Sequence, residues 1–306
     1  MTARFIRATL IAGHGHGPGH RDGVLGIAPK AKILPYGISP PGVVPGAGDL
    51  FDGGNLVVAI RKAVDQGSDI ISISLTTEAS PSLEEAVDYA WRHGVVVLAG
   101  AGNLPIPVLE DLAEVPHVIA VSSSDRGGKR DPKHASWGQE LSMLAPGVDI
   151  PMGYAAGRQY VTATGTSAAT AIAAGTMALV KAKYPLASAG ELYDRLQLTT
   201  TDVGPKGWDE DTGWGVVNPV AALTEKPREV PKPTSSSPTP IAVPTYETGD
   251  PLWVNLLSIA ILVGGALLLG GIVVGVVVWI RRRRRRNAPP EPPPPVATGG
   301  APWTRQ

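Results

Sequence analysis

Cysteine is absent from the 306 residues of the chain. Its absence excludes disulfide bonds and thiolate metal sites, and it is compatible with a bacterial protein outside the cytoplasm without proving export. Carboxylates at metal-binding spacing are missing as well. The run GHGHGPGH, with His14, His16 and His20, is interpreted as a flexible loop with exposed histidines; catalytic use or adventitious metal binding is the alternative. We expect no metal and no cofactor.

Positive charge is scarce over most of the chain. Seven of the 27 basic residues follow Ile280, whereas only one of the 27 acidic residues does. The chain up to Ile280 therefore contains 20 basic and 26 acidic residues. The resulting net charge of about −6 before the tail argues against a nucleic-acid partner, while the tail itself is strongly basic.

One long apolar segment stands apart from the rest of the sequence. Residues 252–280, from Leu252 to Ile280, carry no charge and are long enough to cross a hydrocarbon core of about 30 Å. Trp253 and Trp279 lie at its two ends, and six arginines follow it directly. This pattern predicts a single-pass protein of the cell membrane, with the N-terminal domain extracytoplasmic and the C-terminal tail cytoplasmic.

Composition divides the chain into four predicted parts. Residues 1–225 are the folded part, 226–250 a linker rich in Pro, Ser and Thr, 251–280 the transmembrane helix, and 281–306 a basic and then Pro-rich tail. Within the first part, strands are predicted at 69–75, 94–98 and 118–121, and helices at 55–65, from Ser82 as a cap to 92, and at 167–183. The alternation indicates an α/β fold with a mostly parallel sheet.

Three motifs lie where such a fold places its chemistry. Residues 165–169 (Gly-Thr-Ser-Ala-Ala) lead into the Ala-rich helix, where backbone amides can stabilise charge that develops near a serine nucleophile. Asn103 follows an apolar strand, where an amide could donate to an oxyanion, and residues 72–76 could pair with an extended peptide. Taken singly, the first motif also makes an ordinary helix cap and the asparagine an ordinary turn.

Eight short motifs occur in the same order as in the subtilisin-like serine proteases of family S8, and the chain resembles that family. They lie at residues 22–35, 69–75, 101–103, 118–121, 136–138, 144–147, 165–169 and 213–218. The resemblance covers about residues 8 to 224. It implies a three-layer subtilisin-like α/β fold, N-terminally truncated in this sequence, and hydrolysis of peptide bonds in a protein or peptide substrate.

The same resemblance implies roles for individual residues. Ser167 corresponds to the nucleophile that forms the acyl-enzyme, and Asn103 to the side-chain donor of the oxyanion hole. Substrate contacts are implied for Ser74, Leu75, Thr76, Ala101 and Gly102. The family usually has glycine where Thr76 stands, so no preference is assigned to the first specificity pocket.

The residues after 225 make the resemblance more specific. A Pro-rich stalk followed by a transmembrane helix is similar, among subtilisin-like proteins, to the mycosins, which are associated with actinobacterial type VII secretion. The resemblance implies membrane components of a secretion apparatus as partners, next to the membrane itself through residues 252–280.

The family pattern fails near the N-terminus. The family places Asp, His and Ser in that chain order, and no matching Asp or His is found here. Counting back from residues 10–13 puts the histidine near Ala3, with no His-Gly-Thr motif, Asp strand or signal peptide. The chain as written is therefore expected to begin inside the His helix and to be an inefficient protease, because Ser167 lacks a base. Three interpretations stay open: an endopeptidase with an incomplete N-terminus, a pseudoprotease that binds or scaffolds in a secretion apparatus, and a decayed product that does not fold.

Overall fold

The computed structural model describes residues 3–16, 19, 22–38, 53–75, 77–153 and 160–229. The chain divides into two compact units, Met1–Lys232 and Pro233–Gln306, and all described residues belong to the first. None of the helices in the described ranges is long and apolar enough to cross a membrane. The predicted transmembrane helix at 251–280 and the tail at 281–306 lie outside these ranges, as does most of the predicted linker.

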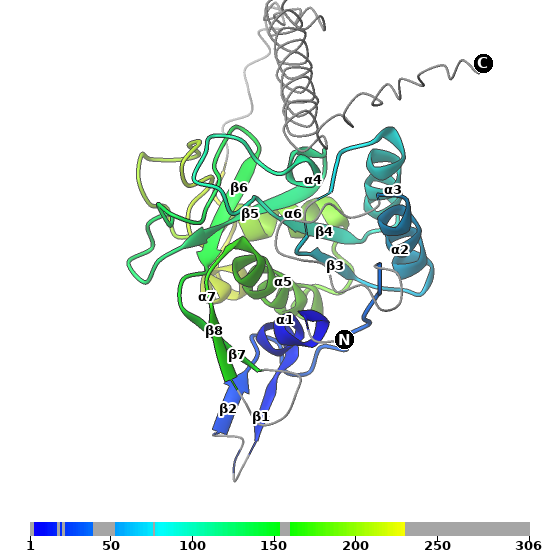
Figure 1. Cartoon of the computed structure of the whole chain (residues 1–306), viewed down its shortest axis with the longest axis horizontal. Coiled ribbons are helices and arrows are strands. Elements are labelled where there is room, and N and C mark those ends of the chain that lie inside the picture. Colours follow the sequence, from blue (N-terminus) through cyan, green and yellow to red (C-terminus); the bar gives the residue numbers. More distant parts are fainter. Residues whose placement is uncertain are drawn as a thin grey trace, which may run out of the picture. The chain divides into compact units, whose positions relative to one another are not determined.

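A parallel sheet of four strands organises the first unit (Figure 1). Its strands lie in the order β3 (Ile70–Ile73), β4 (Val96–Gly100), β5 (Val118–Ser124) and β6 (Leu141–Pro146). Every residue of β5 is buried, which requires apolar or small side chains at consecutive positions, as a strand covered on both faces does. The predicted strands and the mostly parallel sheet of an α/β fold are confirmed.

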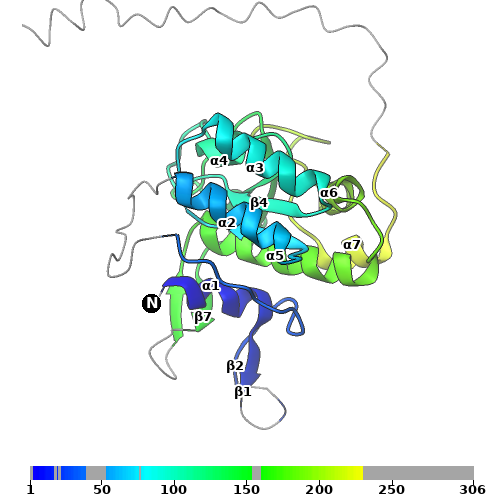
Figure 2. The ribbon, with the colours of Figure 1, turned by 90° about the vertical axis from the view of Figure 1, so that its right-hand side faces the viewer.

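Helices cover both faces of the sheet and make the fold three-layered (Figure 2). One face carries Val97 and Ala99 and packs against α2 (Gly53–Asp65), α3 (Pro81–Arg92) and α4 (Asp111–Glu114). The other carries Val96 and Leu98 and packs against α5 (Thr166–Lys183), α6 (Ala189–Leu198) and α7 (Pro219–Thr224). Successive residues of β4 thus serve opposite cores, as the two-residue period of a strand dictates.

Small side chains allow α5 to lie close to its neighbours. Ala168, Ala171 and Gly175 are buried, and a Cβ at Gly175 would lie 2.8 Å from the Cβ of Ile27. Helix α1 (Ala3–Ala12) packs against α5 and buries Leu10 there. Two antiparallel hairpins complete the unit, β1 (His14–His16) with β2 (Asp22–Leu25), and β7 (Ile150–Gly153) with β8 (Tyr160–Ala163).

Two local predictions are wrong. Ser82 does not cap α3, because the helix already begins at Pro81 and Ser80 Oγ accepts from Leu83 N at 3.2 Å. Proline suits the first helical turn, where an N–H has no partner to lose. His14–His16 is a strand of a hairpin and not a loop, although His14 is exposed as expected. His20 lies outside the described residues.

Candidate active site

The predicted nucleophile Ser167 is the second residue of α5 and is half-buried. The helix is preceded by Gly165, whose φ of +144° is a conformation that favours glycine. A Cβ at Gly165 would also lie only 2.6 Å from Asn103 Oδ1. The turn before the serine therefore needs glycine both for its backbone conformation and for the close approach of Asn103.

Asn103 is held against this turn through its amide oxygen. The Oδ1 atom accepts hydrogen bonds from the backbone N of Thr166 at 2.9 Å and from Thr166 Oγ1 at 3.2 Å. Because a backbone N–H can only donate, this contact settles which amide atom is the oxygen. The Nδ2 group must then be directed away from Thr166, and no acceptor pairs with it within the described part of the chain. The arrangement leaves an oriented, unused donor beside the first turn of α5.

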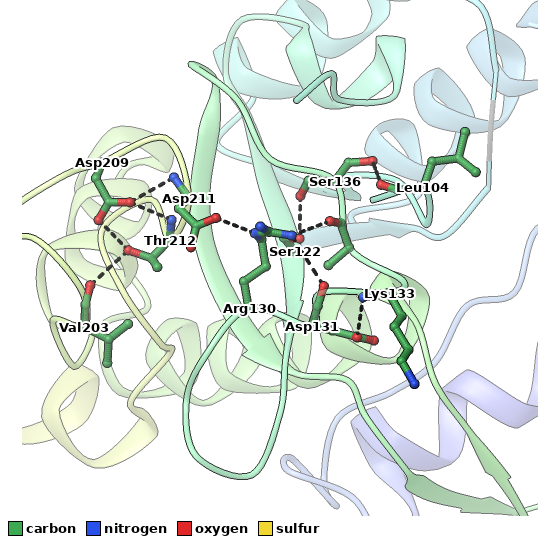
Figure 3. Close-up of polar contacts among 11 residues, drawn as sticks. Leu104, Ser122, Arg130, Asp131, Lys133, Ser136, Val203, Asp209, Asp211 and Thr212 are labelled. Atoms are coloured by element: carbon green, nitrogen blue, oxygen red, sulfur yellow. Dashed lines mark hydrogen bonds and ion pairs between the residues drawn. The ribbon is translucent and has the colours of Figure 1, made fainter. Parts of the chain in front are cut away.

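The segment that carries Asn103 is supported by Ser136 (Figure 3). Ser136 N donates to Gly102 O at 3.1 Å, and Ser136 Oγ donates to Leu104 O at 2.7 Å. Ser122 Oγ in turn donates to Ser136 O at 2.7 Å. Gly102 has a φ of +116°, and a Cβ there would lie 2.7 Å from Ser136 Oγ, so the two residues are fitted to each other.

Arg130 connects the loop that carries Ser136 with Asp211 in the C-terminal part of the domain (Figure 3). Its Nε lies 2.7 Å from Asp211 Oδ1, and its Nη1 donates to Ala135 O at 3.0 Å. Its guanidinium lies 3.9 Å from the centre of the Trp137 ring. The arginine side chain is only 13% exposed, so these contacts fix the loop that holds Asn103.

The predicted substrate contacts have different surroundings. Ser74 Oγ donates to Ser167 O at 3.3 Å, which places the end of β3 beside the first turn of α5. Leu75 follows it in the same segment, and Thr76 lies outside the described residues. Ala101 is fully buried and Gly102 is buried, and their carbonyls accept from Glu110 N and Ser136 N. Substrate binding by these residues stays a prediction.

No side chain in the described ranges hydrogen-bonds to Ser167 Oγ. Three histidines have other partners. His93, at the end of α3, has its Nδ1 2.8 Å from Tyr89 O. The His117 ring stacks on Trp91 with 4.4 Å between ring centres, and His134 Nδ1 lies 3.1 Å from Asp131 Oδ2. Across the same residues, no three His, Asp or Glu side chains are grouped as metal ligands. Among the described residues, the geometry thus places the Asn103 amide beside the turn that carries Ser167 and places no histidine within hydrogen-bond distance of Ser167 Oγ.

Two contributors to this site were missing from the sequence analysis. Thr166 was quoted as part of the Gly-Thr-Ser motif without a role, and its signal was its place next to the serine. Ser136 was quoted in a Ser-Trp-Gly motif, also without a role. Its bond to the Asn103 segment joins residues 32 positions apart, which no local pattern indicates.

Comparison with known proteins gives consistent matches. The model of the Subtilase family, peptidase S8, matches residues 6–215. Subtilisin DY from Bacillus licheniformis is 33% identical over 224 residues, covering 69% of this chain and 78% of that protein. Thermostable alkaline protease from Halalkalibacterium halodurans is 33% identical over 183 residues, and the match spans 60% of this chain but only 48% of that protein.

Solved structures agree with these sequences. The prenylagaramide maturation protease PagA has a TM-score of 0.59 at 28% identity, covering 71% of this chain and 80% of that one. Sphericase has a TM-score of 0.60 at 27% identity, covering 69% of this chain and 76% of that one.

Proposed function

The chain belongs to the subtilase family of serine peptidases, and from this premise we propose that its folded unit hydrolyses peptide bonds through an acyl-enzyme at Ser167. Asn103 is the side-chain donor to the oxyanion. The substrate is a protein or peptide, and Ser74, Leu75, Thr76, Ala101 and Gly102 line its path.

The contact between Thr166 and Asn103 carries this proposal. It fixes the amide so that Nδ2 is a free donor next to Ser167. When Ser167 Oγ attacks a peptide carbonyl, the oxygen of that carbonyl becomes negative, and a preorganised donor stabilises this charge more than it stabilises the substrate. The start of α5 adds the favourable end of its helix dipole.

Proton transfer from Ser167 is expected to limit the rate of peptide hydrolysis by this chain. The proton of Ser167 Oγ has to leave as the bond to carbon forms, and no described side chain accepts it. The sequence has no His-Gly-Thr motif that would supply the base. We therefore expect slow turnover by the 306-residue chain alone, sustained by the oxyanion donor and substrate binding.

A pseudoprotease is the second candidate function. The free Ser167 Oγ supports it, because the surface around Ser167 could bind peptides as a scaffold without cutting them. The uncharged run at 252–280 and the six arginines after it support anchoring in a cell membrane, with the folded unit outside the cytoplasm. The stalk and anchor support a mycosin-like place beside a type VII secretion apparatus.

A peptide boronic acid tests the proposal without relying on turnover, because boron bonds to the serine oxygen and mimics the tetrahedral intermediate. We expect the full chain to bind it, Ser167→Ala to abolish the covalent adduct, and Asn103→Asp to weaken it by about tenfold or more. The carboxylate introduced by Asn103→Asp would still accept both bonds from Thr166 but could no longer donate.

Turnover separates the two candidate functions. Slow cleavage of a fluorogenic peptide that disappears in Ser167→Ala supports the peptidase. Peptide binding with neither cleavage nor boronate adduct supports the pseudoprotease. Fast cleavage that depends on Ser167 would contradict the expectation of weak activity.

A further inference from the structure

A hollow of about 410 Å³ lies at the other end of the sheet from Ser167 and Asn103. Its lining includes Val118 and Leu141, the first residues of β5 and β6, whereas Asn103 follows the last residue of β4. The three strands are parallel, and the seven residues of β5 span roughly 20 Å. A molecule in this hollow would therefore not contact the candidate active site.

The hollow is lined by a largely buried residue whose side-chain amide has no protein partner in the described part of the chain. Gln197, near the end of α6, lines it and is only 6% exposed. The backbone oxygen of Gln197 accepts from Thr200 and Arg228, but its side-chain amide pairs with no group in the described ranges. The amide atoms are not among the fully buried polar atoms that lack a partner, so they are open to the hollow and available to a ligand that hydrogen-bonds to them.

Two carboxylates give the hollow negative charge. Glu114 and Glu140 both line it, and neither forms an ion pair with a basic side chain among the residues described. Partial burial raises the pKa of Glu114, and the negative charges of Glu140 and Asp111 raise it further. A cation placed between the two glutamates would relieve this repulsion.

An indole ring forms a fixed wall of the same hollow. Trp208 is 36% exposed, and its Nε1 donates to Leu141 O at 2.8 Å, which holds the ring in one orientation. The neighbouring Trp214 already has Arg228 5.9 Å from its ring centre, and that arginine is paired with Asp202 at 3.4 Å. Of the two indole rings that line the hollow, the Trp208 ring is therefore the one available for a contact with an added cation.

We propose that the hollow binds an arginine side chain of a partner polypeptide. The guanidinium is planar, so it stacks on Trp208 while its N–H groups donate in its own plane to Glu114, Glu140 and the amide oxygen of Gln197. An ammonium group lacks this combination of a flat face and a fork of donors. A metal ion fits less well, because no three acidic or histidine ligands are grouped in the described part of the chain.

Binding is measured with the full chain in detergent micelles, using N-acetyl-L-arginine methylamide as the probe. The indole N–H signals of a ¹⁵N-labelled sample report on the seven tryptophans, and Trp208→Phe assigns the one in the hollow. We expect saturable movement of the Trp208 signal with a dissociation constant on the order of 1–10 mM, as suits one isolated side chain. The neutral citrulline analogue should leave the signal in place.

Variants identify the groups involved. Glu140→Gln should weaken binding by about fivefold or more, whereas Glu84→Gln, an exposed change on α3, should leave it within about twofold. Gln197→Leu should also weaken binding without lowering the melting temperature, because the amide that it removes makes no hydrogen bond within the described part of the chain. Ser167→Ala should bind normally, which separates this site from the proposed catalytic one.

Three results would overturn the proposal: no saturable movement of the Trp208 signal, equal binding of the citrulline analogue, or an affinity unchanged by Glu140→Gln. Displacement of the arginine probe by micromolar Ca²⁺ would likewise contradict it, since the hollow would then be a metal site.

Discussion

At the residue scale, Asn103 illustrates how an acceptor contact orients a donor. Its Oδ1 takes both the backbone N–H and the hydroxyl of Thr166, so the amide cannot flip without losing two hydrogen bonds. Thr166 is 2% exposed, whereas Asn103 itself is exposed, so the contact lies between a buried residue and a surface residue. The oxyanion donor of the proposed site thus depends on the residue next to Ser167 as much as on Asn103 itself.

Thr166→Val tests this dependence, because valine has nearly the same shape but no hydroxyl. We expect the variant to lose about 1 kcal/mol of unfolding free energy, measured by urea unfolding, since the Asn103 amide loses one of its two donors. Its affinity for a peptide boronic acid should fall as well. Thr162→Val, an exposed change on β8, is the matched control and should alter neither quantity. An unchanged boronate affinity in Thr166→Val would show that the backbone contact alone orients the amide.

Glu114 gives a prediction about pH. Its pKa is raised above the usual 4.5 by partial burial and then by the negative charges of Glu140 and Asp111, while a hydrogen bond from the backbone of Leu109 lowers it. Between the usual and the raised pKa the folded state binds more protons than the unfolded state, so stability falls as pH rises through this interval. We expect Glu114→Gln to be more stable than the parent near pH 7, by less than about 1 kcal/mol because the side chain is exposed, and to show no such gain near pH 3.5. Urea unfolding at both pH values measures this, and a gain of equal size at both would point to a cause other than ionisation.

At the scale of elements, α6 connects the core to the proposed arginine site. Leu192 and Leu196 are buried against the sheet, while Tyr193 and Gln197 line the hollow. The helix begins with a capping box in which Ser188 Oγ accepts from Glu191 N and Glu191 Oε2 accepts from Ser188 N at 2.8 Å. One helix start therefore positions side chains of both the core and the hollow.

Ser188→Ala removes half of this capping box. We expect a loss of about 1 kcal/mol of unfolding free energy near pH 7. The hydrogen bonds from Ser188 hold the pKa of Glu191 below its usual value, so this stabilisation is present above the usual pKa and is lost as pH falls through the lowered one. The larger of these bonds comes from the backbone N–H, which Ser188→Ala retains, so the difference from the parent should shrink in acid only by the share of the hydroxyl bond. Ser82→Ala in α3 serves as the control and should cost less, because the exposed Ser82 hydroxyl contacts the capping Ser80 Oγ at 3.1 Å but does not itself cap the helix.

Local patterns predicted the elements better than the contacts between them. The sequence alone indicates β4, β5 and the Ala-rich start of α5. An element that is buried on both faces needs apolar or small residues in succession, and such runs are visible in the sequence. The bond between Asn103 and Thr166 joins residues 63 positions apart and follows only from the packing of α5 on the sheet. The hollow is further from prediction, since it gathers residues from 113 to 214. The cap of α3 was misplaced because Ser80 and Ser82 both satisfy the local rule.

At the scale of the whole molecule, the two ends of the sheet have different chemistry. The carboxyl end of β4 leads to Asn103 and the first turn of α5, whereas the amino ends of β5 and β6 carry the acidic, aromatic hollow. A peptide in the proposed catalytic cleft and an arginine of a partner in the hollow could thus be bound together. The separation means that occupation of one proposed site would leave the other accessible.

The proposed orientation in the membrane can be tested with the absence of cysteine as an advantage. The chain has no cysteine, so one introduced thiol is the only site for a membrane-impermeant maleimide. Ser236→Cys lies before the apolar run, and Ala288→Cys lies just after the six arginines. Because arginines next to a membrane segment stay in the cytoplasm, we expect Ser236→Cys to be labelled in intact cells and Ala288→Cys only after permeabilisation. Replacing the six arginines with glutamines should blur this difference, since the orientation signal is then removed. Labelling of Ala288→Cys in intact cells would reverse the proposed topology and place the folded unit, with Ser167 and Asn103, on the cytoplasmic side.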